Sequence, residues 1–189
     1  MRVVAGSSRG RSIRAPSGIA IRPTSDKVRE AIFDVLTAFV DLEGATVADL
    51  FAGTGAMGIE ALSRGAGSVV FVDSSALAME AVKANLRSTG LDGASARLVR
   101  SDVLEWLGQG AARDPSASGA FEGPWDLALV DPPYAFAAWE RLLGVLPAKV
   151  AVLESDRPIQ DTEAFDVVRT KRYGGTLVTV VRAAGAIRR

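Results

Sequence analysis

Short continuous runs of apolar residues alternate with segments of helical period along most of the chain. The runs Val69–Val72 and Leu127–Val130 hold only apolar side chains, which is typical of strands buried on both faces of a sheet. We expect strands over residues 45–51, 68–73, 96–101, 126–131 and 149–154, and helices over 57–64, 75–88, 102–108 and 136–145. This alternation predicts an α/β fold with a mostly parallel sheet, right-handed crossovers and helices on both faces.

The last part of the chain departs from this alternation. Two strand-like segments, 167–172 and 177–182, flank Gly174 and Gly175. Strands joined by a short glycine turn indicate an antiparallel hairpin, which is expected to close the sheet. Residues 110–124 are rich in Ala, Gly, Ser and Pro, a composition typical of a long surface loop.

The first residues are expected to form a small basic extension. Strand-like pieces around Arg2–Ala5 and Arg11–Ala15 are joined by a Gly/Ser-rich turn, which predicts a hairpin. After Pro23, the residues Thr24 and Ser25 are good N-caps for a helix that leads into the main domain. We therefore divide the chain into a β-hairpin extension over residues 1–23 and a main domain over residues 24–189.

The 189 residues include no cysteine and no histidine. This excludes cysteine nucleophiles, thiolate zinc sites, iron–sulfur clusters and imidazole catalysis, and no metal is expected. No segment approaches the roughly 18 consecutive apolar residues of a membrane span, and the Arg-rich start lacks the apolar stretch of an export signal. These patterns predict a cytoplasmic protein that works with carboxylates, amines, hydroxyls, backbone groups or a cofactor.

The charges are unevenly distributed although 22 basic residues balance 22 acidic ones. Residues 1–30 hold seven basic and two acidic residues, a net charge of +5, and residues 169–189 hold six basic and no acidic residues. The middle of the chain therefore carries a net charge of −11. Two basic ends around an acidic body are compatible with a polyanionic partner such as RNA.

Three predicted strands end in aspartate. Asp73, Asp102 and Asp131 are each separated by 29 residues, about one strand-helix unit. In an open parallel sheet, ligands bind beyond the carboxyl ends of the strands, so the three side chains are candidates for one polar site. Each is also a good helix N-cap, and for a single residue the two interpretations are equally favoured.

A glycine loop of the form Gly-x-Gly-x-x-Gly, Gly53 to Gly58, lies between the first predicted strand and the next helix. Such a loop lets the backbone approach a ligand closely and presents amide groups at a helix N-terminus. Asp73 follows Gly53 by 20 residues, where a carboxylate accepts ribose hydroxyls. Nicotinamide, flavin and S-adenosylmethionine enzymes share both features, so these two features do not decide which cofactor is bound.

The segment Asp131-Pro132-Pro133-Tyr134 ends the fourth predicted strand. Two prolines fix the backbone and donate no amide hydrogen, so their carbonyls can face a cleft as acceptors. The carboxylate adds an acceptor and Tyr134 a flat face. These groups match the exocyclic amine and planar ring of a nucleobase.

On these stretches the sequence resembles the S-adenosylmethionine-dependent, Rossmann-like class I methyltransferases with a seven-stranded sheet. Within them it is similar to the bacterial 16S ribosomal RNA guanine-N2 methyltransferases, the small-subunit methyltransferase D type. The segments that carry the resemblance are Arg2–Gly6, Arg22–Glu30, Asp49–Gly58 and Asp131–Tyr134.

The resemblance implies a function and a set of site residues. It implies methylation of the N2 amine of a specific guanine in 16S ribosomal RNA, on the small subunit or an assembly intermediate, by a monomer that uses S-adenosylmethionine. Asp131, Pro132, Pro133 and Tyr134 would form the catalytic set. The implied cofactor-binding residues are Asp49, Phe51, Ala52, Gly53, Thr54, Gly55, Asp73, Ser74, Asp102 and Val103. Asp73 would face the ribose of the cofactor, and Asp102 and Val103 its adenine.

The basic ends supply the candidates for RNA binding, namely Arg2, Arg9, Arg11, Arg14, Arg22, Lys171 and Arg172. Ordinary surface charge is the alternative for each of them. For the whole protein the alternatives are an NAD-dependent oxidoreductase, in which Asp131–Tyr134 is only a turn, and a non-catalytic RNA-binding module. Trp106, Trp125, Trp139 and Met79 are expected to pack in or beside the core. Tyr173 is left open, and Glu154 is interpreted as a strand-end carboxylate without a function.

Overall fold

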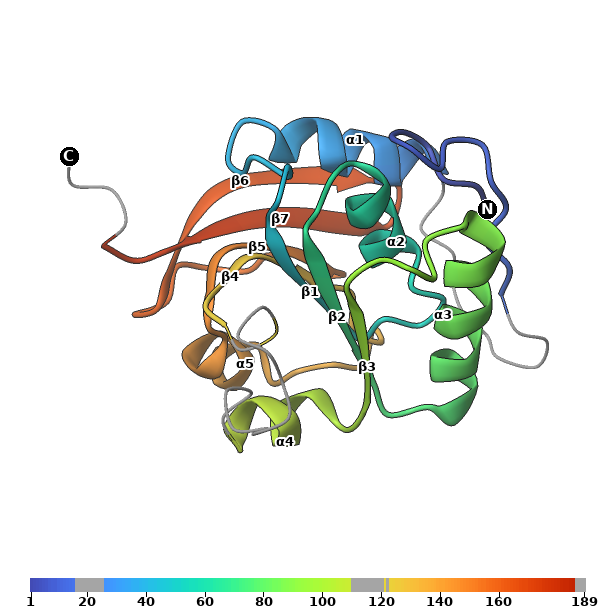
Figure 1. Cartoon of the computed structure of the whole chain (residues 1–189). Coiled ribbons are helices and arrows are strands. Elements are labelled where there is room, and N and C mark those ends of the chain that lie inside the picture. Colours follow the sequence, from blue (N-terminus) through green and yellow to red (C-terminus); the bar gives the residue numbers. More distant parts are fainter. Residues whose placement is uncertain (16–25, 110–120, 122, 186–189) are drawn as a thin grey trace.

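A seven-stranded sheet forms the centre of the molecule in the computed structural model, which describes residues 1–15, 26–109, 121 and 123–185 (Figure 1). Its strands are β1 (Thr46–Leu50), β2 (Ser68–Asp73), β3 (Ala96–Arg100), β4 (Trp125–Val130), β5 (Ala148–Ser155), β6 (Phe165–Tyr173) and β7 (Thr176–Ala183). The strand order is β3-β2-β1-β4-β5-β7-β6. β1 to β5 are parallel, and β7 is antiparallel to both β5 and β6. The predicted Rossmann-like α/β fold with a closing hairpin is confirmed.

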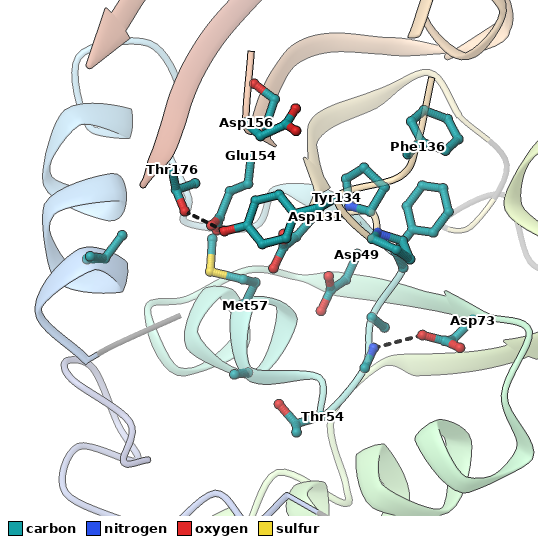
Figure 2. A pocket seen from close by; sticks show the side chains of 18 of the residues that line it. Asp49, Thr54, Met57, Asp73, Asp131, Tyr134, Phe136, Glu154, Asp156 and Thr176 are labelled. Atoms are coloured by element: carbon teal, nitrogen blue, oxygen red, sulfur yellow. Dashed lines mark hydrogen bonds between the residues drawn. The ribbon is translucent and has the colours of Figure 1, made fainter. Parts of the chain in front are cut away.

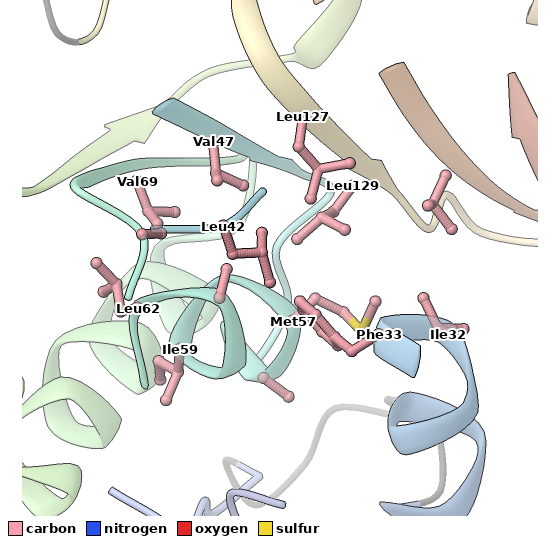
Figure 3. Packing of buried hydrophobic residues seen from close by; sticks show 14 of the residues in the cluster. Ile32, Phe33, Leu42, Val47, Met57, Ile59, Leu62, Val69, Leu127 and Leu129 are labelled. Atoms are coloured by element: carbon pink, nitrogen blue, oxygen red, sulfur yellow. The ribbon is translucent and has the colours of Figure 1, made fainter. Parts of the chain in front are cut away.

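The helices cover the two faces of the sheet (Figure 1). They are α1 (Asp26–Leu36), α2 (Ala56–Ser63), α3 (Ala76–Thr89), α4 (Val103–Gly108) and α5 (Trp139–Val145). Successive strand residues point to opposite faces, so Val69 and Phe71 pack with α1, α2 and α3, whereas Val70 and Val72 pack with α4 and α5. Figure 3 shows the first of these two cores.

The first five strands begin and end within one residue of their predicted bounds. The signal is clearest in β2 and β4, whose apolar runs are buried on both faces. The last predicted helix is shorter than expected. It begins at Trp139 rather than residue 136, since the chain first turns at Phe136, whose N–H donates to the Pro133 carbonyl. Within the part of the chain that the structure describes, no helix combines the length and the apolar character that crossing a membrane requires.

The N-terminal segment pairs with itself over a shorter stretch than predicted. Arg2 and Ser12 form an isolated antiparallel bridge, and no strand is present among the described residues 1–15. The pairing ends because the N–H groups of Val4 and Ala5 donate instead to the Glu60 carboxylate of α2, at 2.8 and 2.9 Å. The expected domain boundary at residue 23 and the caps Thr24 and Ser25 lie outside the described residues, as does most of the predicted loop 110–124.

Candidate active site

A cavity of about 540 Å³ lies at the carboxyl ends of the parallel strands, where the strand order reverses between β1 and β4 (Figure 2). Such a reversal is where open α/β sheets bind ligands. Most of the residues proposed from the sequence for cofactor and substrate line this cavity: Asp49, Phe51, Ala52, Gly53, Thr54, Asp73, Ser74, Asp131, Pro132, Pro133 and Tyr134. The fold therefore brings the glycine loop and the Asp-Pro-Pro-Tyr segment to one place.

The glycine loop is held in shape by Asp73. One carboxylate oxygen of Asp73 accepts from the Gly53 N–H at 2.9 Å and the other from the Ser75 N–H at 2.8 Å. Phe51 adopts a left-handed φ of 62°, which is unusual for a bulky side chain and is often found at functional sites. Asp73 thus lines the cavity and also fixes the loop that leads into α2.

Asp49 is the buried carboxylate at the floor of the cavity. It is 4% exposed, and its Oδ2 accepts from the Gly58 N–H at 2.9 Å. Burial raises the pKa of Asp49 to about 8; the Gly58 hydrogen bond opposes this shift, and the charges of Asp131 and Asp73 add to it. Asp49 is therefore mostly protonated at neutral pH until a positively charged group approaches it.

Gly58 is required for packing rather than for ligand approach. A Cβ atom there would lie 2.4 Å from Cε1 of Phe71 and 2.9 Å from Oδ2 of Asp49. The third glycine of the loop therefore lets α2 lie directly on β2, and that contact places the Gly58 N–H against the Asp49 carboxylate.

The Asp-Pro-Pro-Tyr segment forms one wall of the cavity. Asp131 follows β4 directly, Pro132 is buried, and Tyr134 is 44% exposed. The Tyr134 hydroxyl makes a 3.1 Å hydrogen bond with the hydroxyl of Thr176, the first residue of β7 (Figure 2). The C-terminal hairpin thus fixes the orientation of a flat aromatic face at the cavity.

Several residues of the cavity were not proposed from the sequence. Phe136 makes edge-on contacts with Phe51 and Trp139, with ring centroids 5.3 and 5.1 Å apart, and all three side chains line the cavity. Trp139 was expected to serve packing alone, which it does only in part. Trp106 and the buried Trp125 stack on each other at 5.7 Å, as expected for core and flank residues. The other unpredicted lining residues are Met1, Val28, Ala56, Met57, Glu154, Ser155, Asp156, Tyr173 and Thr176.

The cavity is strongly acidic. Five carboxyl groups line it, from Asp49, Asp73, Asp131, Glu154 and Asp156. None of the described lining residues is lysine or arginine. Like charges in a partly desolvated cleft repel one another, and the resulting potential attracts a cationic ligand.

Asp102 and Val103 are not among the residues that line the cavity, and neither is Gly55. The Asp102 carboxylate caps α4 and accepts from the Glu105 N–H at 3.0 Å. Val103 is buried in the core beneath α4, and Gly55 caps α2 with a left-handed φ of 75°. Of the three regularly spaced aspartates, two therefore face the cavity and one serves as a helix cap.

The basic segments from both ends of the chain adjoin the cavity. Met1 of the extension and Tyr173 of the C-terminal hairpin both line it. The described basic residues proposed for RNA binding are all exposed to solvent, namely Arg2, Arg9, Arg11, Arg14, Lys171 and Arg172. Arg22 lies outside the described residues. Lys171 and Arg172 therefore lie directly before a residue of the cavity wall. The turn with Arg9 and Arg11 instead packs on the C-terminal ends of α2 and α3, where Ser8 bonds to Ser63 and Thr89, whereas the cavity lies at the start of these helices.

One arginine counted in the basic N-terminal segment is not at the surface. Arg29 is fully buried and pairs with the equally buried Glu60 at 3.4 Å and with Asp26 at 2.9 Å. It also donates to the Arg2 carbonyl. A buried charge requires such partners, and through them Arg29 connects the extension, α1 and α2. Because it is buried, Arg29 does not contribute to an RNA-binding surface.

Comparison with known proteins gives consistent matches. Residues 1–182 match the family described as "Conserved hypothetical protein 95". The chain is 36% identical to YlbH of Bacillus subtilis, provisionally named an rRNA methyltransferase, with 98% of this chain and 100% of that protein covered. It is 31% identical to Ribosomal RNA small subunit methyltransferase D of Escherichia coli, over 77% of this chain and 66% of that protein.

Solved structures agree with the fold. A structure of yhhF from Escherichia coli, provisionally described as a methyltransferase, superposes with a TM-score of 0.79 at 27% identity, and 97% of each chain is covered. The magnesium protoporphyrin IX methyltransferase of Synechocystis with bound S-adenosylmethionine superposes with a TM-score of 0.61 at 15% identity, covering 88% of this chain and 87% of that one. At this identity the second likeness concerns the fold alone.

Proposed function

The chain belongs to the family described as conserved hypothetical protein 95, and we propose that it is an S-adenosylmethionine-dependent enzyme that methylates the N2 amine of a guanine in 16S ribosomal RNA. The single observation that carries the proposal is an acidic cavity that has the glycine loop on one side and Asp131–Tyr134 on the other. The names of the relatives support the rRNA substrate. The cytoplasmic location, the monomeric state and the role of residues 1–23 as an RNA-binding extension belong to the same proposal.

The charge of the cavity fits the proposed cofactor. S-adenosylmethionine carries a sulfonium, an ammonium and one carboxylate, and its net charge is therefore positive. A dinucleotide such as NAD carries two negative phosphates, which five carboxyl groups without a lysine or arginine among the described lining residues would repel. This contrast favours a methyltransferase over the oxidoreductase alternative.

Individual residues have chemistry that suits parts of the cofactor. The carboxylate of Asp73, at the end of β2, suits the ribose hydroxyls, and the backbone of Gly53 to Gly55 allows the methionine portion to approach closely. Asp49 lies where a cationic group would favour its ionised form. The contribution of Asp102 and Val103 to adenine binding stays a prediction, since neither lines the cavity.

When bound, the cofactor supplies an electrophilic methyl group. The task of the chain is then to orient the acceptor amine, whose lone pair is delocalised into the guanine ring. The Asp131 carboxylate and the Pro132 carbonyl would accept the two N–H hydrogens of that amine and favour a lone pair directed at the methyl group. The exposed Tyr134 ring would stack on the base, which has to leave its neighbours to reach the cavity.

Deletion of the gene, followed by mapping of modified guanines in small-subunit RNA, tests the substrate. We expect one N2-methylguanosine to disappear and to return with the wild-type gene and with Asp92→Ala, an exposed control. Asp131→Ala is expected to bind S-adenosylmethionine and to lose methyl transfer to subunits from the deletion strain. Unchanged modification in the deletion strain contradicts the proposed substrate, and normal transfer by Asp131→Ala contradicts the assigned role of the carboxylate. A non-catalytic RNA-binding module would bind the subunits and incorporate no methyl group.

A further inference from the structure

Glu154 is a carboxylate of the cavity whose position suggests a role in choosing the base. It is the penultimate residue of β5, it is 7% exposed, and it lines the cavity. β4 and β5 are parallel and pair Val130 with Leu153, so Asp131 and Glu154 follow at the same level on neighbouring strands. Adjacent strands are about 4.8 Å apart. Figure 2 shows both carboxyl groups on the side of the cavity where the Tyr134 ring lies.

The Tyr134 ring would set the plane of a bound base. It is held by a 3.1 Å hydrogen bond between its hydroxyl and that of Thr176. A base stacked on this ring with its amine at Asp131 would turn one of the two ring atoms that flank the amine toward the neighbouring strand. Glu154 therefore lies where it can contact a ring atom adjacent to the amine.

The ring atoms beside the amine differ among the RNA bases. In guanine the N2 amine lies between N1–H, a hydrogen-bond donor, and N3, an acceptor. In adenine and cytosine the amine lies between an unprotonated ring nitrogen, an acceptor, and a ring carbon, so neither base offers a donor beside its amine. A carboxylate accepts hydrogen bonds and repels another lone pair, so a carboxylate at this position favours guanine over both other amino-bearing bases.

We propose that Glu154 is the residue that selects guanine, by accepting the N1–H hydrogen of the base whose N2 amine is held by Asp131. The proposal rests on the proposed function of the same site and adds the reason for its base specificity. The Asp-Pro-Pro-Tyr segment offers acceptors to any amine, whereas Glu154 distinguishes the atom beside it. Asp156, the exposed carboxylate two residues later, does not occupy the register position next to Asp131.

A base analogue tests this directly. 2-Aminopurine keeps the 2-amino group of guanine but has an unprotonated N1 and no O6. Small subunits are reconstituted with 16S RNA that carries either guanine or 2-aminopurine at the nucleotide identified by the mapping experiment. Methyl transfer is measured with the wild type, with Glu154→Gln, and with Glu163→Gln, which makes the same chemical change at an exposed position.

The wild type and the control are expected to prefer guanine over 2-aminopurine by at least about a hundredfold in kcat/KM, since a buried polar group without its partner is strongly rejected. Glu154→Gln is expected to lose roughly tenfold on guanine, because a charged acceptor becomes a neutral one. The same variant is expected to gain on 2-aminopurine, because the glutamine amide donates to the unprotonated N1. The preference should therefore fall by more than about tenfold.

All three enzymes are tested on the same 2-aminopurine substrate, which lacks O6. A change in preference between the enzymes therefore reports the effect of residue 154 alone. Unchanged preference in a folded Glu154→Gln that still binds S-adenosylmethionine overturns the proposal. Comparable transfer by the wild type to both bases overturns it as well, whether or not the variant folds. Failure of the proposed function gives a different result, in which the wild type does not methylate the guanine substrate at all.

Discussion

Replacement of Asp49 by asparagine is expected to stabilise the cofactor-free protein and to weaken cofactor binding. Asp49 is buried with a pKa raised to about 8, whereas the unperturbed carboxyl titrates near 3.8. Between these values the folded protein holds a proton that the unfolded chain has released. The stability of the wild type therefore falls as the pH rises through this window. Asparagine has a similar shape, can accept from the Gly58 N–H, and does not titrate.

The size of the effect follows from the width of the window. Each pH unit in which the proton count differs by one changes the free energy of unfolding by about 1.4 kcal/mol. Between pH 5 and 7 the wild type is expected to lose about 3 kcal/mol relative to Asp49→Asn. For a chain of this length that corresponds to a change of roughly 6–12 °C in the difference between the two melting temperatures.

Two measurements at several pH values check this prediction. Thermal unfolding without cofactor gives the stability difference, in which all other titrating groups are shared by the two proteins. Binding of S-adenosylmethionine gives the second difference. A cation favours ionised Asp49, so the affinity advantage of the wild type over Asp49→Asn is expected to grow with pH, by up to about tenfold per unit below pH 8. Titration of the cofactor's own amine affects both proteins and cancels in the ratio.

A melting-temperature difference that is the same at pH 5 and pH 7 would refute the reasoning. It would mean that Asp49 is ionised in the folded protein at both pH values, despite its burial and the neighbouring charges of Asp73 and Asp131. An asparagine variant that binds the cofactor as tightly as the wild type at pH 8 would separately show that no cationic group lies against Asp49.

Three further predictions concern the RNA-binding surface and the packing of the glycine loop. The first replaces three exposed arginines together by glutamine, namely Arg9, Arg11 and Arg14. We expect weaker binding to small subunits, a slope of log K against log salt that is flatter by up to about 0.9 per lost phosphate contact, and unchanged cofactor affinity. Equal subunit affinity would remove them from the interface. Gly58→Ala is expected to cost about 1–3 kcal/mol in denaturant unfolding, because its Cβ would lie 2.4 Å from the Phe71 ring; an unchanged midpoint contradicts this. Asn85→Ala removes a buried 2.9 Å hydrogen bond to the Thr54 carbonyl and two partly buried bonds to the backbone of Arg14. We expect a lower melting temperature together with weaker cofactor binding. Normal cofactor binding would show that these bonds do not support the glycine loop.

The strands and the position of the cavity were predictable because each has a strong local signal. β2, for example, is apolar from Val69 to Val72, and this run fixed the bounds of the strand to within a residue. The glycine loop and the Asp-Pro-Pro-Tyr segment both follow strands of the parallel sheet, and parallel strands end at one edge. The topology alone therefore brings them together.

The residues that sequence reasoning misplaced or missed depend on contacts that no local pattern carries. Asp102 has the same spacing as Asp73 and Asp131, yet it follows the edge strand β3, and its carboxylate turns to the first turn of α4. Trp139 is an aromatic residue in an apolar stretch, which predicts packing; it also lines the cavity, as the first residue of a helix that begins three residues later than predicted. Glu154 lies near the end of a buried strand, level with Asp131 beside the neighbouring strand, and this similar position was the signal in the sequence that could have identified it.

The net charge of a segment describes its surface only after the buried charged residues are left out of the count. Arg29 belongs to the basic start of the chain, and Glu60 to the acidic middle, yet both are buried and neutralise each other. The pair leaves the overall balance unchanged while it fixes the extension on α2 through the N–H groups of Val4 and Ala5. In our proposal the five carboxyl groups of the cavity attract the cationic cofactor, and exposed basic residues of the two end segments contact RNA. These two kinds of charge lie on different parts of the molecule, so a net charge of zero is compatible with a polyanionic partner.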